Sequence, residues 1–122
     1  MIEIQNKEDI LIISYKINVR LELDIAKQLV AQRLAYQNGK EYPAVFYLKH
    51  IKSITKEARS YMNKEGAKGI TLRAFVVKNN IEKILLRFFL GIEKPLVPSN
   101  YFINEEDAIA WIKEAQNKNN SV

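Results

Sequence analysis

Apolar residues along the chain recur with two spacings, which predict alternating strands and helices. Short runs of β-branched and other apolar residues predict strands, at residues 2–4, 10–15, 43–48, 72–77 and 101–103. Apolar positions three and four residues apart, each set following a residue that caps helices, predict helices at residues 25–37, 56–65, 81–92 and 105–116. The third strand run is almost continuously apolar, which is typical of a strand covered on both faces.

The order β-β-α-β-α-β-α-β-α predicts an α/β fold with a mostly parallel mixed sheet and covering helices. The first strand alternates apolar and polar residues and is expected to pair antiparallel at one edge. The length of 122 residues fits one domain. We expect this domain to span residues 1–116 and the polar residues 117–122 to form a disordered tail.

The predicted third helix is apolar on more than one side. At 100° per residue, one stripe is expected to cover the sheet, and it contains Ile81, Ile84, Leu85, Phe88 and Ile92. Further apolar residues point away from that stripe, namely Leu86, Phe89 and Leu90. An apolar surface without an intramolecular cover marks a partner surface, an oligomer contact or a ligand groove. The alternative is that the proline-containing segment 93–100 folds back over these residues.

A second candidate site lies where the central strand ends and the second helix begins. The hydroxyl residues Ser53 and Thr55 stand there between Lys52 and Lys56. Ligands commonly bind at this edge of open α/β sheets, and helix N-termini suit anions. These residues are therefore a candidate regulatory hydroxyl or anion site, and the simpler alternative is that Thr55 only caps the helix.

The residue types that enzyme chemistry needs are mostly missing. The chain has no cysteine, which excludes thiolate catalysis and cysteine–zinc sites, and its single histidine is His50. No Gly-x-Ser-x-Gly elbow accompanies any serine, and the glycines form no phosphate-binding loop. The acidic run 105–107 follows the capping residue Asn104, so the helix dipole explains it without a catalytic role. We expect a protein that is not an enzyme and holds no metal or cofactor.

The net charge of +5 raises the question of a nucleic-acid or membrane partner. The basic residues are scattered and interleaved with acids, so nucleic acid is a minor alternative, which would use Lys49, Lys52, Lys56, Arg59 and Lys68. The N-terminus has no secretion-signal pattern, and no apolar run approaches the ~20 residues that span a bilayer. We expect a cytoplasmic protein without a transmembrane segment.

The element order and two segments carry a family resemblance. Residues 101–112 consist of an aromatic strand, an acidic cap, and a helix with Ala and Trp, and residues 52–59 form the strand-to-helix junction. Both resemble small bacterial STAS/SEC14-type proteins, and the whole order resembles the STAS domain of anti-sigma-factor antagonists, the SpoIIAA-like fold. STAS antagonists carry an Asp-Ser pair at this junction, and residues 54–57 lack it.

The resemblance implies a regulatory module that acts by protein–protein contact, with itself as a homodimer and with another regulatory protein. Its contact surface would be the third helix. The SEC14-like side of the family implies an alternative, in which the chain carries or senses a small apolar, lipid-like or anionic ligand. Weak nucleic-acid binding through the basic residues is the remaining alternative.

Overall fold

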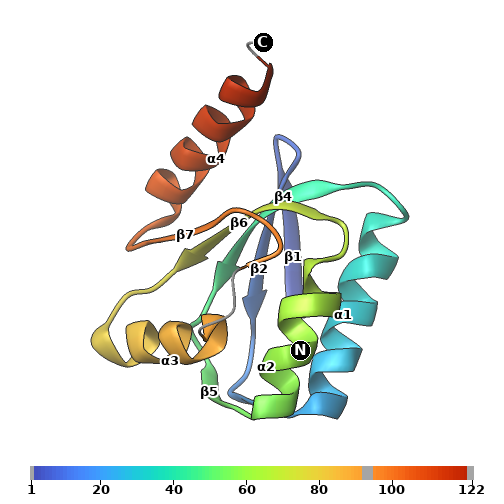
Figure 1. Ribbon diagram of the computed structural model, residues 1–122, viewed down its shortest axis with the longest axis vertical. Coiled ribbons are helices and arrows are strands. Elements are labelled where there is room, and N and C mark those ends of the chain that lie inside the picture. The colour runs from blue at the N-terminus through green and yellow to red at the C-terminus, as the bar shows by residue number, and fades with distance from the viewer. Residues whose placement is uncertain (1, 92–94, 121–122) are drawn as a thin grey trace.

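The computed structural model describes residues 2–91 and 95–120, and a five-stranded sheet forms its centre (Figure 1). The strands lie in the order β1-β2-β4-β6-β7, with bounds Ile2–Lys7 (β1), Ile10–Tyr15 (β2), Tyr42–Tyr47 (β4), Ile70–Val76 (β6) and Ser99–Phe102 (β7). β1 is antiparallel to β2, and all other neighbours are parallel. The predicted mixed sheet with an antiparallel edge is confirmed.

The hairpin between β1 and β2 follows from its turn residues. Glu8 and Asp9 have φ values of 53° and 65°, as the two central residues of a type I′ turn require. The side-chain Oδ1 of Asn6 accepts a 2.9 Å hydrogen bond from the backbone N–H of Asp9. This turn sets the register in which Lys7 opposes Ile10.

Helices cover both faces of the sheet. Three lie on one face: α1 (Leu23–Gln37), α2 (Lys56–Lys64) with the 3-10 turn η1 (Glu65–Ala67), and α3 (Asn80–Leu90). The fourth, α4 (Glu105–Asn120), packs on the opposite face through Ala108 and Ile112 (Figure 1). Two separate apolar cores result, one under α1 to α3 and the other under α4.

β2 shows why the central strands read as continuous apolar runs. Leu11 and Ile13 point into the core under α1 to α3, whereas Ile10 and Ile12 point into the core under α4. Side chains alternate between the two faces of a strand, so both faces need apolar residues. Each such side chain stabilises the fold by about 1.5–3 kcal/mol on burial.

A second, two-stranded parallel sheet was not predicted. It pairs β3 (Val19–Leu21) with β5 (Ile51–Ile54). The backbone turns after β4 at His50, whose φ is 76°, and the N–H of Val19 donates a 2.7 Å bond to the His50 carbonyl. The chain therefore reaches α2 through a short strand, and not directly from the central strand. Three- and four-residue strands are too short to show a clear period in sequence.

α4 extends further than expected. It runs to Asn120, so residues 117–120 are helical, and the prediction of a disordered tail from residue 117 is wrong for them. Lys118 Nζ lies 3.6 Å from Glu114 Oε1, an i,i+4 pair of the kind that supports a helix end. Ser121 and Val122 lie outside the described residues.

Candidate functional site

The outer side of α3 carries exposed apolar residues, but they are not the residues that were predicted to face outward. Ile81, Ile84 and Phe88 are 79%, 64% and 45% exposed. Leu86 and Phe89, which were expected to face outward, are buried in the core, and Leu90 is half-buried. The expected surplus of apolar residues on α3 is present, but its orientation was predicted the wrong way round. Ile92 lies outside the described residues.

Contacts with β6 and α2 set the rotation of α3. The ring of Phe89 packs edge-on against Phe75 at 5.7 Å, and its backbone carbonyl accepts a 2.7 Å hydrogen bond from Asn63 Nδ2. At the other end, Asn79 Oδ1 accepts from the N–H of Glu82 at 2.8 Å, as a helix cap does. Both apolar sides of α3 match helix periodicity, so only these contacts decide which side is buried.

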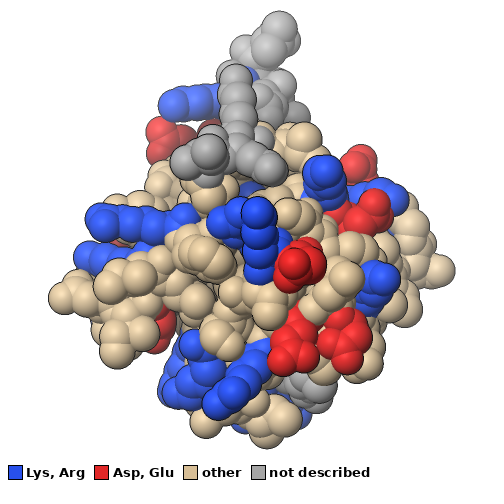
Figure 2. Space-filling model, turned by 60° about the horizontal axis from the view of Figure 1, so that its bottom comes forward, with Lys and Arg blue, Asp and Glu red and all other residues tan. Residues whose placement is uncertain are grey.

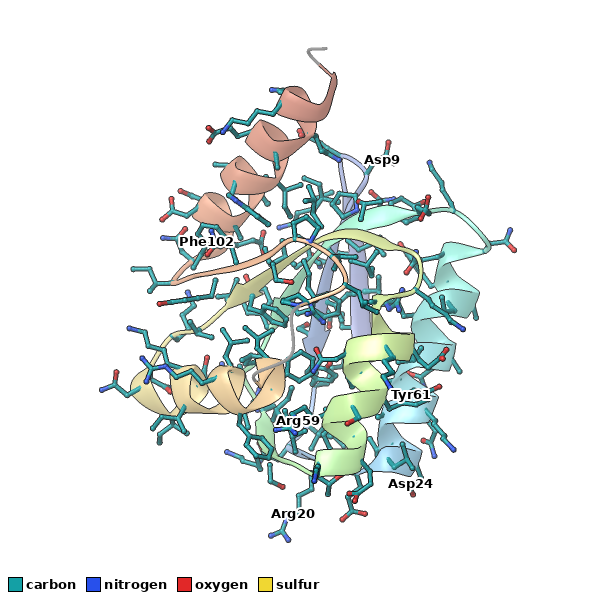
Figure 3. The ribbon with its side chains drawn as sticks, viewed as in Figure 1. Asp9, Arg20, Asp24, Arg59, Tyr61 and Phe102 are labelled. Atoms are coloured by element: carbon teal, nitrogen blue, oxygen red, sulfur yellow. The ribbon has the colours of Figure 1, made fainter. Side chains whose placement is uncertain are left out.

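Basic side chains border the exposed stripe of α3, which we define as Ile81, Ile84 and Phe88. On one side the guanidinium of Arg59 stacks on the Phe88 ring at 5.0 Å and donates a 3.4 Å bond to the Phe88 carbonyl. Figure 3 shows Arg59 reaching from α2 toward α3. The stripe therefore has the half-buried guanidinium of Arg59 on this border.

The other border of the stripe is a small hollow between α3 and β7. It has a volume of about 70 Å³ and is lined by Lys83, Leu86, Arg87, Leu90 and Tyr101. Lys83 and Arg87 are both exposed. In Figure 2, Asp and Glu side chains lie mainly away from the side where α3 is seen in Figure 1. On that side Lys and Arg stand among residues of neither charge. The stripe thus has cations on both borders.

The junction at α2 is organised as a cap. Thr55 Oγ1 accepts a 3.2 Å hydrogen bond from the N–H of Ala58, so this residue caps α2. Lys52 and Ser53 are exposed residues of β5, and Lys56 is the first residue of α2.

The surroundings of Thr55 do not favour an anion. Thr55 shares a surface hollow with one lysine, Lys27, and with three carboxylates, those of Glu22, Asp24 and Glu57. Figure 3 shows Asp24 at this end of the molecule. Carboxylates at this position offset the attraction of the helix N-terminus for a negative group.

The acidic start of α4 does more than complement a helix dipole. Glu105 Oε1 accepts a 2.6 Å hydrogen bond from the Tyr47 hydroxyl, and Glu105 Oε2 lies 2.6 Å from Lys7 Nζ. Burial, which has the larger effect, and the hydrogen bond to Glu105 together raise the pKa of Tyr47 to about 12. Tyr47 is an aromatic residue in an apolar run, so nothing in the sequence indicated its polar role.

Among the described residues, no group of three or more His, Asp and Glu side chains could hold a metal ion. His50 Nδ1 lies 3.2 Å from Asn18 Oδ1 in the loop after β4. Within the same residues, no helix has the length and apolar composition required to cross a membrane.

The basic residues considered for nucleic acid do not share one arrangement. Lys68 Nζ lies 2.6 Å from Glu65 Oε2 after α2, whereas Arg59 stacks on Phe88 of α3. Lys49 lines a hollow with Tyr47 and Glu105 near the α4 face. A nucleic-acid surface would need these cations along one path, so the geometry weakens that alternative.

Two buried arginines are the feature that sequence reasoning missed. Arg33 of α1 and Arg73 of β6 are 2% and 3% exposed. Arginine is rarely buried, so a pattern of apolar positions assigns it to the surface. The one available signal was Arg73, which interrupts the apolar run 72–77.

Comparisons with known proteins agree with this fold. The family described as domain of unknown function DUF7793 matches residues 2–116. A search of curated proteins finds no significant match.

Two solved structures are similar over nearly the whole chain. One is an uncharacterised protein of the DUF3478 family with a SpoIIAA-like fold from Shewanella loihica PV-4, at TM-score 0.62 and 13% identity, covering 91% of each chain. The other is a serine-to-glutamate variant of RsbS from Moorella thermoacetica, at TM-score 0.64 and 12% identity, covering 95% of this chain and 97% of that chain. The fold is SpoIIAA-like, that of a STAS domain, as the sequence resemblance implied.

Proposed function

Because the chain belongs to the family described as domain of unknown function DUF7793 and has the SpoIIAA-like fold, we propose that it is a cytoplasmic, non-enzymatic regulatory module that binds another protein. Residues 1–116 would act as one domain. The observation that carries this proposal is the exposed stripe of α3. Contiguous apolar residues on a surface are costly to leave in water, and they typically form the centre of a protein contact.

The charges around the stripe favour an acidic partner. Lys83 and Arg87 border it on one side, and Arg59 borders it on the other. A partner whose apolar residues are flanked by carboxylates would bury the stripe and pair with these cations. RsbS shares the fold, but the assignment of a partner to this chain rests on α3 alone.

A homodimer through the same stripe meets an electrostatic obstacle. A two-fold contact places the same patch of both copies together, so the exposed cations Lys83 and Arg87 of both copies would lie on one contact. Like charges brought together at a contact oppose association. The homodimer suggested by the family resemblance is therefore the second candidate, and a measurement of mass separates the two.

A designed helical peptide tests the proposed partner chemistry. It carries leucines at helix positions i, i+3, i+4 and i+7 with flanking glutamates, and a second peptide replaces each glutamate by lysine. The acidic peptide is expected to shift the backbone NMR signals of Ile81, Ile84 and Phe88, and the basic peptide is not. Equal binding of both peptides, or shifts away from α3, would overturn the acidic-partner proposal.

Two variants complete the test. Ile84→Glu should abolish binding of the acidic peptide, whereas Ile17→Glu, at another exposed isoleucine, should leave it unchanged. Light scattering on the same proteins gives the mass of the free chain. A dimer that Ile84→Glu splits would show that the partner is a second copy, against the charge argument.

A further inference from the structure

β1 forms one edge of the five-stranded sheet. β2 lies on its inner side, and no strand of residues 2–91 and 95–120 lies on its outer side. The turn between β1 and β2 has two residues, and in such a hairpin the residues that flank the turn exchange backbone hydrogen bonds. Here those residues are Lys7 and Ile10. Because the backbone direction alternates along a strand, Gln5 and Glu3 also bond to β2.

The intervening residues of β1 are Ile2, Ile4 and Asn6, and their backbone N–H and C=O groups therefore point away from the sheet. These groups make no hydrogen bond with another described residue. A row of unpaired backbone donors and acceptors is a template for a further strand, and natural edges are usually blunted by short length, proline or bulges. β1 has six residues, no proline and no shift of register.

The opposite edge of the sheet, β7, has the protection that β1 lacks. β7 has four residues and follows Pro98. The carbonyls of Pro98 and Phe102 accept hydrogen bonds from the side of β6, so the backbone of Tyr101 points outward. The N–H of Tyr101 donates a 2.8 Å bond to Asn100 Oδ1, which satisfies it within the chain. Of the two edges, β1 is the one that remains open to a partner strand.

α1 adds apolar side chains beside this open edge. Leu23 and Lys27 of α1 line a hollow together with residues of α2, so their side of α1 faces α2. At 100° per residue, Ile25 and Tyr36 lie on the other side of the helix. Figure 1 shows α1 at the end of the sheet where β1 lies. Tyr36 is 47% exposed and Ile25 is half-buried, so a partner at β1 has apolar surface of α1 to cover.

A second copy of the chain fits this edge when the two β1 strands run antiparallel. A two-fold axis beside Gln5 pairs Ile4 of one copy with Asn6 of the other, and these are residues whose backbone groups point outward. Each such pair exchanges two backbone hydrogen bonds, and the two-fold axis produces the pair twice.

The same register brings opposite charges together. Glu3 of each copy lies opposite Lys7 of the other copy, on one face of the joined sheet, and opposite charges on facing strands stabilise their pairing. Lys7 also approaches Glu105, and Glu3 lies 3.6 Å from Lys16. An ammonium has three donors and a carboxylate has several acceptor positions, so both residues can keep these contacts in a dimer.

We propose that two copies of this chain pair along β1 and form one continuous sheet that contains the five strands of each copy. The side of α1 with Ile25 and Tyr36 would flank the contact. α3 lies at the other end of the sheet, so its exposed stripe stays open to a different partner (Figure 1). The proposal therefore does not depend on the proposed function.

Amide hydrogen exchange in the wild-type protein tests this dimer. Light scattering should show a dimer that dissociates on dilution. The backbone amides of Ile4 and Asn6 should exchange about tenfold more slowly, or slower still, in the dimer than in the monomer. The amide of Gln5 should change less, because it bonds to β2 in both states. A monomer at every concentration, or equal exchange of Ile4 and Asn6 in the two states, would overturn the proposal.

Ile4→Pro removes an outward donor and keeps the bonds to β2, since proline is tolerated where the N–H of an edge strand points outward. This variant should weaken dimerisation by about tenfold or more. Ile4→Ala is the matched control, because it also shortens the side chain but retains the N–H, and it should weaken dimerisation less. Circular dichroism first establishes that each variant is folded. Dimerisation of folded Ile4→Pro with the wild-type affinity would contradict the proposed contact.

Charge reversal tests the register. Glu3→Lys and Lys7→Glu should each weaken the homodimer, because each places like charges opposite one another. An equimolar mixture of the two folded variants should form a heterodimer, since each contact then joins a lysine to a glutamate. This rescue separates an effect on the contact from an effect on folding. A mixture that stays monomeric would overturn the proposed register, and a wild-type dimer that Ile84→Glu dissociates would place the contact on α3 instead.

Discussion

The hydroxyl of Tyr47, the last residue of β4, donates a 2.6 Å hydrogen bond to Oε1 of Glu105, the first residue of α4. Lys7, at the end of β1, approaches the other carboxylate oxygen at the same distance. One side chain at the start of α4 is thereby joined to two strands of the sheet. α4 is the only helix on its face among the described residues, so this contact is positioned to hold that layer in place.

Removal of the Glu105 charge should destabilise the protein in a pH-dependent way. Burial by itself raises the pKa of Glu105, but hydrogen bonds from Lys7 and Tyr47 and nearby lysine charges outweigh it, so the pKa is lowered from 4.5. A carboxylate with a lowered folded pKa stabilises above its unfolded pKa, and this stability is lost as pH falls through the folded pKa. Glu105→Gln should lower the free energy of unfolding by about 1 kcal/mol at neutral pH.

Urea denaturation at several pH values checks this prediction. The difference between wild type and Glu105→Gln should be constant at neutral pH and shrink below pH 4.5, the ordinary value for the carboxyl. Glu106→Gln is the matched control, because Glu106 is the next residue of α4 and is exposed. A pH-independent difference would show that the charge of Glu105 does not contribute.

Truncation of a side chain on the buried side of α3 should destabilise the protein much more than truncation on the exposed side. Leu86→Ala removes a side chain that is 3% exposed, and should lower the free energy of unfolding by about 3 kcal/mol. Ile84→Ala, on the exposed stripe, should change it by no more than about 0.5 kcal/mol. Chemical denaturation followed by circular dichroism measures both. An equal cost at the two positions would contradict the observed rotation of α3.

Thr55 should be replaceable only by residues that keep its cap. Thr55→Ala leaves the N–H of Ala58 without its side-chain acceptor, and should lower the free energy of unfolding by about 1 kcal/mol. Thr55→Ser retains the oxygen and should stay close to wild type. The comparison is made by urea denaturation, and a large loss in the serine variant would point to a role for the methyl group instead.

Gly69 should tolerate alanine less well than Gly39. Both have positive φ, 76° and 83°, so alanine is strained at either position. A Cβ at Gly69 would also lie 2.9 Å from Gln37 Nε2, which donates to the carbonyls of Lys40 and Gly69. At Gly39 nothing lies within 4 Å.

We expect Gly39→Ala to cost about 1 kcal/mol and Gly69→Ala clearly more, because only the latter also displaces a buried amide. Thermal unfolding of the two variants provides the comparison. Equal melting temperatures would show that Gln37 can move without loss of its hydrogen bonds.

Several parts of the fold followed from local sequence. The apolar run of β2, the caps Asn79 and Thr55, and the aromatic and acidic pattern around β7 and α4 each involve residues close together in the chain. The β3–β5 pair escaped prediction because its partners lie far apart, as where Leu21 opposes Ile54. Exposed apolar residues were predicted on α3 and are present there, but the side of the helix on which they lie was predicted wrongly.

The sequence by itself determined the types and order of the main elements, because hydrophobic period and capping depend on neighbouring residues. Only the tertiary structure decided which side of α3 is exposed, since the contact of Phe89 with Phe75 rotates the helix. It also decided that Arg33 and Arg73 line one cavity, although they belong to α1 and β6. Such placements depend on contacts between distant segments, which no local pattern encodes.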